Sequence, residues 1–526
     1  MHRWALLVAL LALTSLACSE NPTFKRSECW FPIPASSDRE VECGFIKVPE
    51  KHQGGGEKIE LAVVRISRGK QFRTRSAVFY LQGGPGGGLT ESAPFFIQSV
   101  APILASDRDL VLVDQRGTGL SSPFLGCPPP SSQNISSAQY LLECRQAMIA
   151  QGVDLSAFNS VENAADIDAV RRVLGYPRMV LYGSSYGTLL AQHVARDFPE
   201  SVESMILDAP LPKDRSYLAE LPASAQGALD AVFESCANDP LCAPIYPNLA
   251  QTFYTLIAQL NVAPYVFDVS VFPEAPTNFK LDVDGFVSSV LVDGLLFLGL
   301  GAEVPRAIYA LRDAPTKIEA RQELKEILRF LLRLNGSGGD SSGFADAMFY
   351  STLCAESGVF GPEAINLQGV RPEISEVYRD RASSILDECR VWNVPALPPD
   401  RLAPITTGVP TLCLAGAFDP RTPPRFCDYI IGDAASPRLS AATKVSFPRL
   451  GHGVLLANEC VNTIVAQFLQ TPTNAPNAAC VGGSSRPFNT PVARLPLDRA
   501  QVEMLDNLRL KGIGQGDLRP RLQGLR

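Results

Sequence analysis

The segment GSSYG at residues 183–187 is the clearest candidate for a catalytic group in this sequence. It matches the pattern G-x-S-x-G, with an apolar run rich in strand-forming residues before it and a helical pattern after it. In that context the middle serine lies on a sharp strand-to-helix turn, where its hydroxyl is exposed at the end of a sheet. We therefore predict that Ser185 is a nucleophile, with a purely structural Gly-rich turn as the alternative.

A serine nucleophile needs a general base, and the scarcity of histidine narrows the choice. Beyond residue 20 the chain has only His52, His193 and His452. His193 lies on the helix that follows Ser185, roughly 12 Å further along its axis, so we expect it to pack in the core. His52 lies in the polar segment KHQGGGEK, where a solvated side chain is expected. His452, in LGHGV directly after the last predicted core strand, is the predicted general base.

A carboxylate must hold the imidazole of such a base in the correct tautomer and stabilise its protonated form. Asp419, in LAGAFDPRTP, follows the preceding predicted strand and gives the chain order Ser, Asp, His. Asp208, in LDAP after the strand that follows the nucleophile helix, is the competing candidate. We predict Asp419 as the acid.

Glycine-rich turns after two other predicted strands complete this edge of the sheet. The segment LQGGPGGG allows backbone N–H groups to point at a developing oxyanion, so Gly84 and Tyr186, the residue after the nucleophile, are the predicted oxyanion pair. The segment DQRGTGLSS has a predicted structural role, in which Asp114 and Arg116 fix the loop.

The elements that must position these residues are short buried strands alternating with helices. Helices are predicted around residues 161–174, after Gly187, near Arg425 and at 454–469. This alternation predicts an α/β fold with a mostly parallel sheet covered by helices on both faces. The predicted strands are residues 59–67, 76–82, 110–114, 178–183, 204–209, 410–416 and 444–450.

Residues 210–404 interrupt the alternation with helical stretches, such as 317–334, and Gly-rich or Pro-rich loops. We interpret this region as a large, mainly helical cap inserted into a discontinuous core. A short amphipathic helix is predicted near residues 497–510, with no assigned chemistry. The predicted organisation is 1–20 signal peptide, 21–209 first part of the core, 210–404 cap, 405–470 second part of the core with acid and base, and 471–526 linker and tail.

The first twenty residues have a basic start, a short apolar stretch and small residues before Cys18, which is typical of a secretory signal. Cleavage after Ala17 and lipoprotein processing, with Cys18 as the lipid-bearing first residue, are both open. Ser15 departs from the leucine usual in a lipobox. The apolar stretch at 295–300 is too short to cross a bilayer. We expect an exported protein that is periplasmic, secreted or tethered to the envelope through lipid on Cys18.

Cysteine usage agrees with export. Without Cys18 twelve cysteines remain, an even number suited to an oxidising compartment. A zinc site is disfavoured because the sequence has no CxxC and few histidines, and no metal or cofactor is expected. Proximity in the sequence suggests, without proving, the pairs Cys29–Cys43, Cys127–Cys144, Cys236–Cys242, Cys354–Cys389, Cys413–Cys427 and Cys460–Cys480.

Composition excludes several classes of protein. Of the 526 residues, 46% are hydrophobic and 19% are charged, and glycine and proline follow no period, which excludes disordered, collagen-like and coiled-coil chains. The net charge is −7, so nothing favours a nucleic-acid partner, which would need a basic face. The oligomeric state cannot be derived from the sequence.

Five motifs in order resemble the prolyl and tripeptidyl aminopeptidase family of α/β hydrolases, over about residues 27–482. The resemblance implies the α/β-hydrolase fold and a serine exopeptidase that acts on peptide N-termini. Gln82 stands where prolyl iminopeptidases have the histidine of HGGPG, which favours the exported, disulfide-bearing tripeptidyl-type branch. The motifs are QGGPGG, DQRGTGLS, GSSYGT, FDPRTP and GHG.

The resemblance also implies a site for the substrate's amino group. STLCAESG resembles the family's Cys-x-Asp/Glu segment, which points to Glu356 as the partner of the ammonium, with a surface glutamate beside a disulfide as the alternative. Two other functions stay open. One is an esterase or amidase acting on a small non-peptide substrate, and the other is an inactive envelope lipoprotein that binds ligands.

Overall fold

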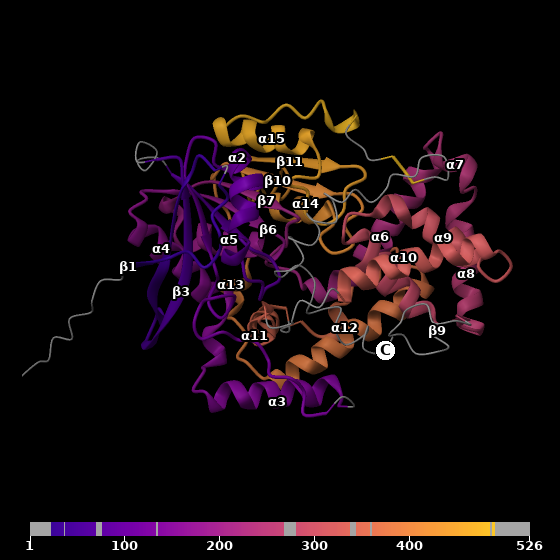
Figure 1. The fold of residues 1–526 in the computed structure, drawn as a ribbon, viewed down its shortest axis with the longest axis horizontal. Helices are drawn as coiled ribbons and strands as arrows, with labels where there is room; N and C mark the ends of the chain where they lie inside the picture. Colours follow the sequence, from indigo (N-terminus) through magenta and orange to yellow (C-terminus); the bar gives the residue numbers. More distant parts are fainter. Residues whose placement is uncertain are drawn as a thin grey trace, which may run out of the picture.

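A central nine-stranded sheet organises the chain (Figure 1). The computed structural model describes residues 23–35, 37–69, 76–132, 135–267, 280–336, 343–357, 360–483 and 487–489. The strand order is β1-β2-β3-β5-β4-β6-β7-β10-β11. The strands are β1 (Phe24–Ser27), β2 (Glu40–Lys51), β3 (Gly55–Ser67), β4 (Ala77–Leu81), β5 (Leu110–Val113), β6 (Met179–Ser184), β7 (Val202–Asp208), β10 (Thr411–Gly416) and β11 (Ala442–Phe447).

Six neighbouring strands, from β5 to β11 in the sheet order, run parallel, whereas β1, β2 and β3 form an antiparallel ribbon that joins β5. Because parallel strands end at one edge, the segments after β4, β6, β10 and β11 come together there. The mostly parallel sheet predicted from the sequence is confirmed. Strands β1 and β2 were not predicted.

Helices cover both faces of the sheet, as the alternation predicts. On one face α4 (Ser160–Leu174) and α5 (Tyr186–Asp197) share a buried apolar cluster with the strands. On the other face α2 (Ala101–Leu104) and α15 (Glu459–Gln470) do the same. The strands at the centre of the sheet, β4, β5, β6 and β10, are therefore buried along their whole length, which explains their mostly apolar sequences.

The helix expected from residue 454 begins later, at Glu459. Asn458 caps it by accepting the N–H of Val461. The helix does not extend back to residue 454, because Leu456 has φ 66°, a left-handed conformation that interrupts a right-handed helix. The N–H groups of Val454 and Leu455 are instead bound by a buried carboxylate, that of Asp208.

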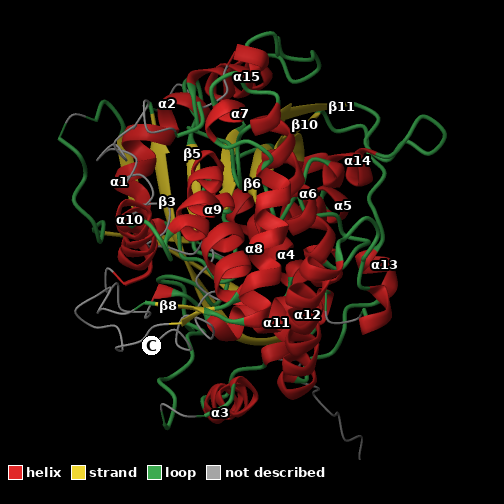
Figure 2. Ribbon diagram, turned by 90° about the vertical axis from the view of Figure 1, so that its right-hand side faces the viewer, coloured by secondary structure: helices red, strands yellow, loops and turns green. Residues whose placement is uncertain are grey.

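Between β7 and β10 the chain forms a set of helices with an apolar core of its own. In Figure 1 they lie mainly on the right of the sheet, and in Figure 2 several of them lie in front of the strands. The apolar stretch at 295–300 follows a buried π-helix, η6 (Gly285–Leu296). The other helices are α6 (Tyr217–Ala237), α7 (Cys242–Ile245), α8 (Leu249–Val262), α9 (Val304–Asp313), α10 (Ile318–Gly336), α11 (Asp346–Glu356), α12 (Pro372–Trp392) and α13 (Pro399–Leu402), and a short ribbon joins β8 (Tyr265–Val266) to β9 (Lys280–Leu281).

Six disulfides link the described cysteines, in the pairs that proximity in the sequence suggests. Cys127–Cys144 ties α3 (Ser137–Ala150) to the loop before it, and Cys354–Cys389 joins α11 to α12. Removing one native disulfide typically costs about 2–5 kcal/mol of stability in small secreted domains. The cross-links therefore contribute to the rigidity of both the core and the cap.

No helix in the described part of the chain combines the length and apolar character that crossing a membrane requires. The predicted signal peptide, with Cys18, and the predicted helix near residues 497–510 lie outside the described residues.

Candidate active site

Ser185 occupies the turn between β6 and α5, as the sequence predicts. Its backbone has φ 54° and ψ −122°, a conformation that a non-glycine residue rarely adopts. A Cβ on Gly183 would lie 2.4 Å from the Gly187 carbonyl oxygen, and a Cβ on Gly187 would lie 1.9 Å from that of Leu81. Only glycine therefore fits at both positions, and the turn holds the serine in a strained, partly exposed position.

The His452 ring and the Asp419 carboxylate are in direct contact. His452 Nδ1 lies 2.9 Å from Asp419 Oδ2, and both side chains are buried. The second oxygen, Asp419 Oδ1, accepts the backbone N–H groups of Arg421 and Thr422 at 2.8 and 2.9 Å. Burial alone would raise the pKa of Asp419. The charge of His452, together with hydrogen bonds from His452 and Thr422, instead holds this pKa below its usual value. The carboxylate is thus kept ionised beside the imidazole.

The ring of His452 is further oriented by two neighbours. It stacks on Phe297, with the ring centroids 4.7 Å apart. The hydroxyl of Thr422 lies 3.1 Å from His452 Nδ1 and also contacts Asp419. Thr422 was not predicted from the sequence, although its place in FDPRTP, three residues after Asp419, is a usable signal. His452 and Ser185 line the same cavity.

Asp208, the competing acid candidate, makes different contacts. Its carboxylate accepts the N–H groups of Val454 and Leu455 and the hydroxyl of Tyr182. Burial raises the pKa of Asp208, against these hydrogen bonds, which lower it. Asp208 therefore holds the backbone that follows His452, whereas Asp419 contacts the ring itself.

The glycine-rich loop after β4 lies against the turn that holds Ser185. A Cβ built on Gly83 would lie 3.0 Å from Ser185 Cβ, so a larger residue there would crowd the serine. The next residue, Gly84, has φ 114° and lines the cavity together with Tyr186. Both predicted oxyanion donors thus belong to the wall that contains Ser185, and Gly83, which the sequence analysis did not single out, sets the close approach.

Asp114 ties this loop to its neighbour. Its carboxylate accepts the N–H groups of Leu89 and Thr90 from the glycine-rich loop, and that of Leu120 from the loop after β5. The loop geometry near Ser185 thus depends on a fully buried carboxylate, as its predicted structural role requires.

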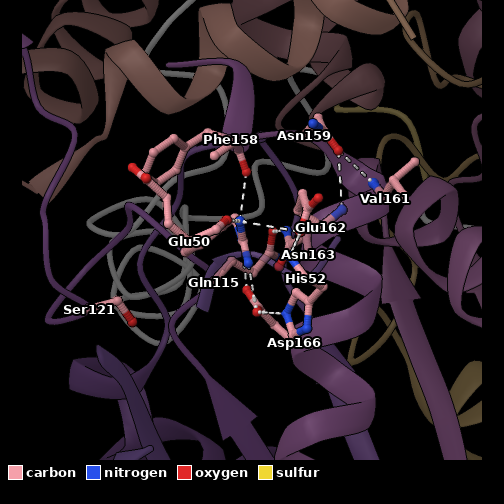
Figure 3. Close-up of polar contacts among 12 residues, drawn as sticks. Glu50, His52, Gln115, Ser121, Phe158, Asn159, Val161, Glu162, Asn163 and Asp166 are labelled. Atoms are coloured by element: carbon pink, nitrogen blue, oxygen red, sulfur yellow. Dashed lines mark hydrogen bonds and ion pairs between the residues drawn. The ribbon is translucent and has the colours of Figure 1, made fainter. Parts of the chain in front are cut away.

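Arg116 fixes the base of the same region. Its guanidinium makes two hydrogen bonds of 2.7 Å with Asp166 on α4 and two with the carbonyl oxygens of Glu50 and Ala157. His52, expected to be solvated, instead points at Asp166, with Nε2 2.8 Å from Oδ1 (Figure 3). This cluster is saturated with internal contacts, so we assign it a structural role.

Glu356, at the C-terminal end of α11, lines the cavity from the cap. It accepts hydrogen bonds from the backbone N–H and the hydroxyl of Ser160, at 2.8 and 3.0 Å, and is not the surface residue of the alternative interpretation. Burial raises its pKa to about 7, although the bonds to Ser160 and the charge of Lys213 lower it. Two hydrogen bonds leave carboxylate lone pairs available to a ligand.

The remaining wall follows α5 and the loop after β7. Leu189 and His193 continue the α5 face that begins at Ser185, and Lys213 lies opposite on the loop. His193 is fully buried, as expected of a packing residue, but it also borders the cavity. Lys213 was missed because a single lysine in PLPKDRS looks like an ordinary solvated residue.

Comparison with known proteins is consistent with this architecture. The family described as alpha/beta hydrolase fold matches residues 76–458, well over half of the chain. The chain belongs to that family. This α/β hydrolase is also similar to proteins named as peptidases, over part of its length.

Three relatives illustrate the extent of that similarity. The YuaR protein of Escherichia coli is 28% identical over 256 residues, 45% of this chain and 50% of the relative. Tripeptidyl aminopeptidase of Streptomyces coelicolor is 32% identical over 189 residues, 32% of this chain and 35% of the relative. Serine protease Hip1 of Mycobacterium tuberculosis is 26% identical over 270 residues, 45% of this chain and 51% of the relative. The chain thus spans about half or less of the length of the curated relatives that it matches.

Proposed function

We propose that this α/β hydrolase is a serine aminopeptidase that hydrolyses peptides near their N-terminus. The observation that carries the proposal is one cavity lined by Ser185, by His452 in contact with Asp419, and by a buried carboxylate, Glu356. The first three groups match a nucleophile, a base and an orienting acid. The fourth suits a substrate ammonium.

In the proposed reaction His452 removes the proton of the Ser185 hydroxyl as the oxygen attacks the substrate carbonyl. The resulting positive imidazole is stabilised by Asp419. The backbone N–H groups of Gly84 and Tyr186 stabilise the negative oxygen of the tetrahedral intermediate. The leaving amine then takes the proton from His452, and an ester bond to Ser185 remains.

Hydrolysis of that ester completes the cycle. His452 removes a proton from water, the hydroxide attacks the ester carbonyl, and the proton returns to Ser185 as the acid product leaves. This step regenerates the free enzyme without any cofactor.

The sharpest test of the aminopeptidase function compares matched substrates that differ only at the amino group. We expect kcat/KM for a free-amine peptide anilide to exceed that for its N-acetylated form by roughly 30-fold or more, because the blocked form cannot pair with Glu356. Preference for the N-acetylated form, or for simple esters, would favour the esterase or amidase alternative. Absence of turnover of all three would favour an inactive binding protein.

We further propose that the protein is exported. Support comes from six disulfides, which persist in oxidising compartments, and from the signal-like N-terminus. Mass spectrometry of the protein from a bacterial host tests the two processing routes. A diacylglyceryl group on Cys18 supports a lipid tether, and an unmodified N-terminus supports secretion.

A further inference from the structure

The cavity wall contains one buried cation without a hydrogen-bond partner. Three basic side chains line the cavity, those of Lys213, Arg215 and Arg421. Arg421 is paired with Asp293 at 2.6 Å, and Arg215 lies 3.6 Å from Glu220. The Lys213 ammonium, on a residue that is 3% exposed, has no hydrogen-bond partner among the described residues. Burying a charged group without a hydrogen-bond partner is unfavourable in free energy. A cavity ligand that supplies an acceptor to Lys213 is therefore expected to bind more tightly.

The surroundings of Lys213 favour an anion over a neutral acceptor. Burial and repulsion by Arg196 lower the pKa of Lys213 to about 7, while Glu356 acts in the opposite direction. Arg196 and Arg401 both bind the carboxylate of Asp197, and Arg401 also lies 3.7 Å from Asp400. These two cations are therefore already paired, whereas a ligand carboxylate beside Lys213 would restore the full charge of the lysine.

The position of Lys213 along the cavity indicates which part of a substrate it would meet. Ser185, Leu189 and His193 lie on one face of α5, at successive intervals of four residues, and all three line the cavity. The distance from Ser185 to His193 is roughly 12 Å along the helix axis. An extended peptide advances about 3.3–3.6 Å per residue, so about three residues cover that distance.

Lys213 lies at the far end of this path. The loop that carries it is fixed to α5 beside His193, because the side-chain amide of Gln192 donates a hydrogen bond of 2.7 Å to the carbonyl oxygen of Leu211. The charge of Lys213 also lowers the pKa of His193, although burial contributes more. Ser216, three residues after Lys213, donates a hydrogen bond of 3.3 Å to the carbonyl oxygen of Ser357, the residue after Glu356. The Lys213 ammonium itself makes no hydrogen bond to the Glu356 carboxylate. The Glu356 carboxylate and the Lys213 ammonium thus lie on neighbouring segments of the same cavity wall.

From this geometry we propose that Lys213 binds the side-chain carboxylate of an acidic residue at the amino terminus of the substrate, while Glu356 binds the α-ammonium of the same residue. The proposal deepens the aminopeptidase function and rests on it. It makes peptides that begin with Asp or Glu, cleaved after about three residues, the preferred class of substrate. Both charges of such a residue would be matched within one end of the cavity.

The test uses tripeptide anilides that begin with Glu or Gln and are otherwise identical, since the two side chains match in size. For the wild-type enzyme we expect kcat/KM to be at least roughly tenfold higher for the Glu substrate, because a charge-assisted contact is stronger than a neutral one. In Lys213→Met, which keeps the length of the side chain without its charge, the Glu/Gln ratio is expected to fall to one or below. In Arg215→Gln, which removes a cation from the same wall, the ratio is expected to stay within about twofold of wild type, since screening weakens a half-exposed charge.

Two results would overturn the proposal. A wild-type Glu/Gln ratio of one or less does so without any variant, even if Lys213→Met fails to fold. A Lys213-dependent preference for the acidic residue at the second or third position would overturn its assignment to the first residue.

Failure of the aminopeptidase function has a separate signature. In that case free-amine and N-acetylated forms of the uncharged substrate would be turned over equally, whatever the Glu/Gln ratio.

The unliganded Lys213→Met protein is expected to melt at the same temperature as wild type or higher, since the variant loses a buried unpaired charge.

Discussion

The guanidinium of Arg421 donates a hydrogen bond of 2.6 Å to the carboxylate of Asp293, which joins the acid loop of the core to helix η6 of the cap. Arg381 on α12 binds the other oxygen of Asp293 at 2.7 Å, and all three side chains are buried. The backbone N–H of Arg421 in turn donates to Asp419. The position of the catalytic-acid candidate is therefore connected to the cap through a buried charge network.

Because of this network, we expect Asp293→Ala to destabilise the fold strongly. The substitution removes the carboxylate that two buried guanidinium groups share, so we expect the free energy of unfolding to fall by about 3–5 kcal/mol. Denaturant unfolding measures it. The control is Asp387→Ala, which breaks the exposed pair with Arg390 and should cost less than about 1 kcal/mol. Equal effects of the two substitutions would contradict the role of the buried network.

Covalent labelling tests the nucleophile and the base. Ser185→Ala and His452→Ala are each expected to abolish labelling by a fluorophosphonate, because only a base-activated hydroxyl attacks the probe readily. His193→Gln is the control, since His193 lies too far along α5 to reach the hydroxyl. Labelling of folded Ser185→Ala would remove Ser185 from the proposed mechanism.

The two acid candidates are separable because their contacts differ. Asp419→Asn should lower kcat by roughly 10³–10⁴-fold, through loss of the correct imidazole tautomer. Asp208→Asn keeps an acceptor oxygen for the backbone after His452, so we expect kcat to change less than about tenfold and stability to fall by about 1–3 kcal/mol. Steady-state kinetics with a thermal melt measures both effects, and the reverse order of kcat values would assign the acid to Asp208.

Local patterns predicted most of the core, because a run rich in apolar residues and followed by a turn occurs in each of the strands β3, β4, β5, β6, β7, β10 and β11. Strands β1 and β2 lack that signal. Strand β1 (FKRS) is polar and lies at the sheet edge, and β2 mixes charged residues with Gly and Pro, so their pairing depends on partners distant in the sequence.

The residues of the candidate site likewise include some that local sequence patterns predict and some that they do not. Ser185, Asp419 and His452 each follow a strand at the carboxyl edge of the sheet, so strand prediction alone places them together, and their catalytic roles stay predictions. Lys213 was not predictable, because its burial depends on α5 and on the cap. The contact of His52 likewise depends on Asp166, which is far away in the sequence.

The last prediction concerns pH, because Glu356 has a pKa raised to about 7 by burial. If its ionised form binds the substrate ammonium, kcat/KM for free-amine peptides should fall as the pH decreases from about 7.5 to 5.5, a range in which an α-amino group is mostly protonated. Dividing by kcat/KM for the N-acetylated peptide removes the titration of His452, which both substrates share. We expect this ratio to fall by roughly tenfold per pH unit well below pH 7.

The contribution of Glu356 to the free energy of unfolding should change in the opposite direction and increase as the pH falls. A carboxyl group whose pKa is raised on folding stabilises the fold at low pH, and this contribution is lost as the pH rises between about 4.5 and 7. In Glu356→Gln both effects should disappear, with a free-amine preference that is low and independent of pH. A wild-type ratio that is constant from pH 5.5 to 7.5, or a Glu356→Gln enzyme that keeps the wild-type pH dependence, would mean that another group binds the amine.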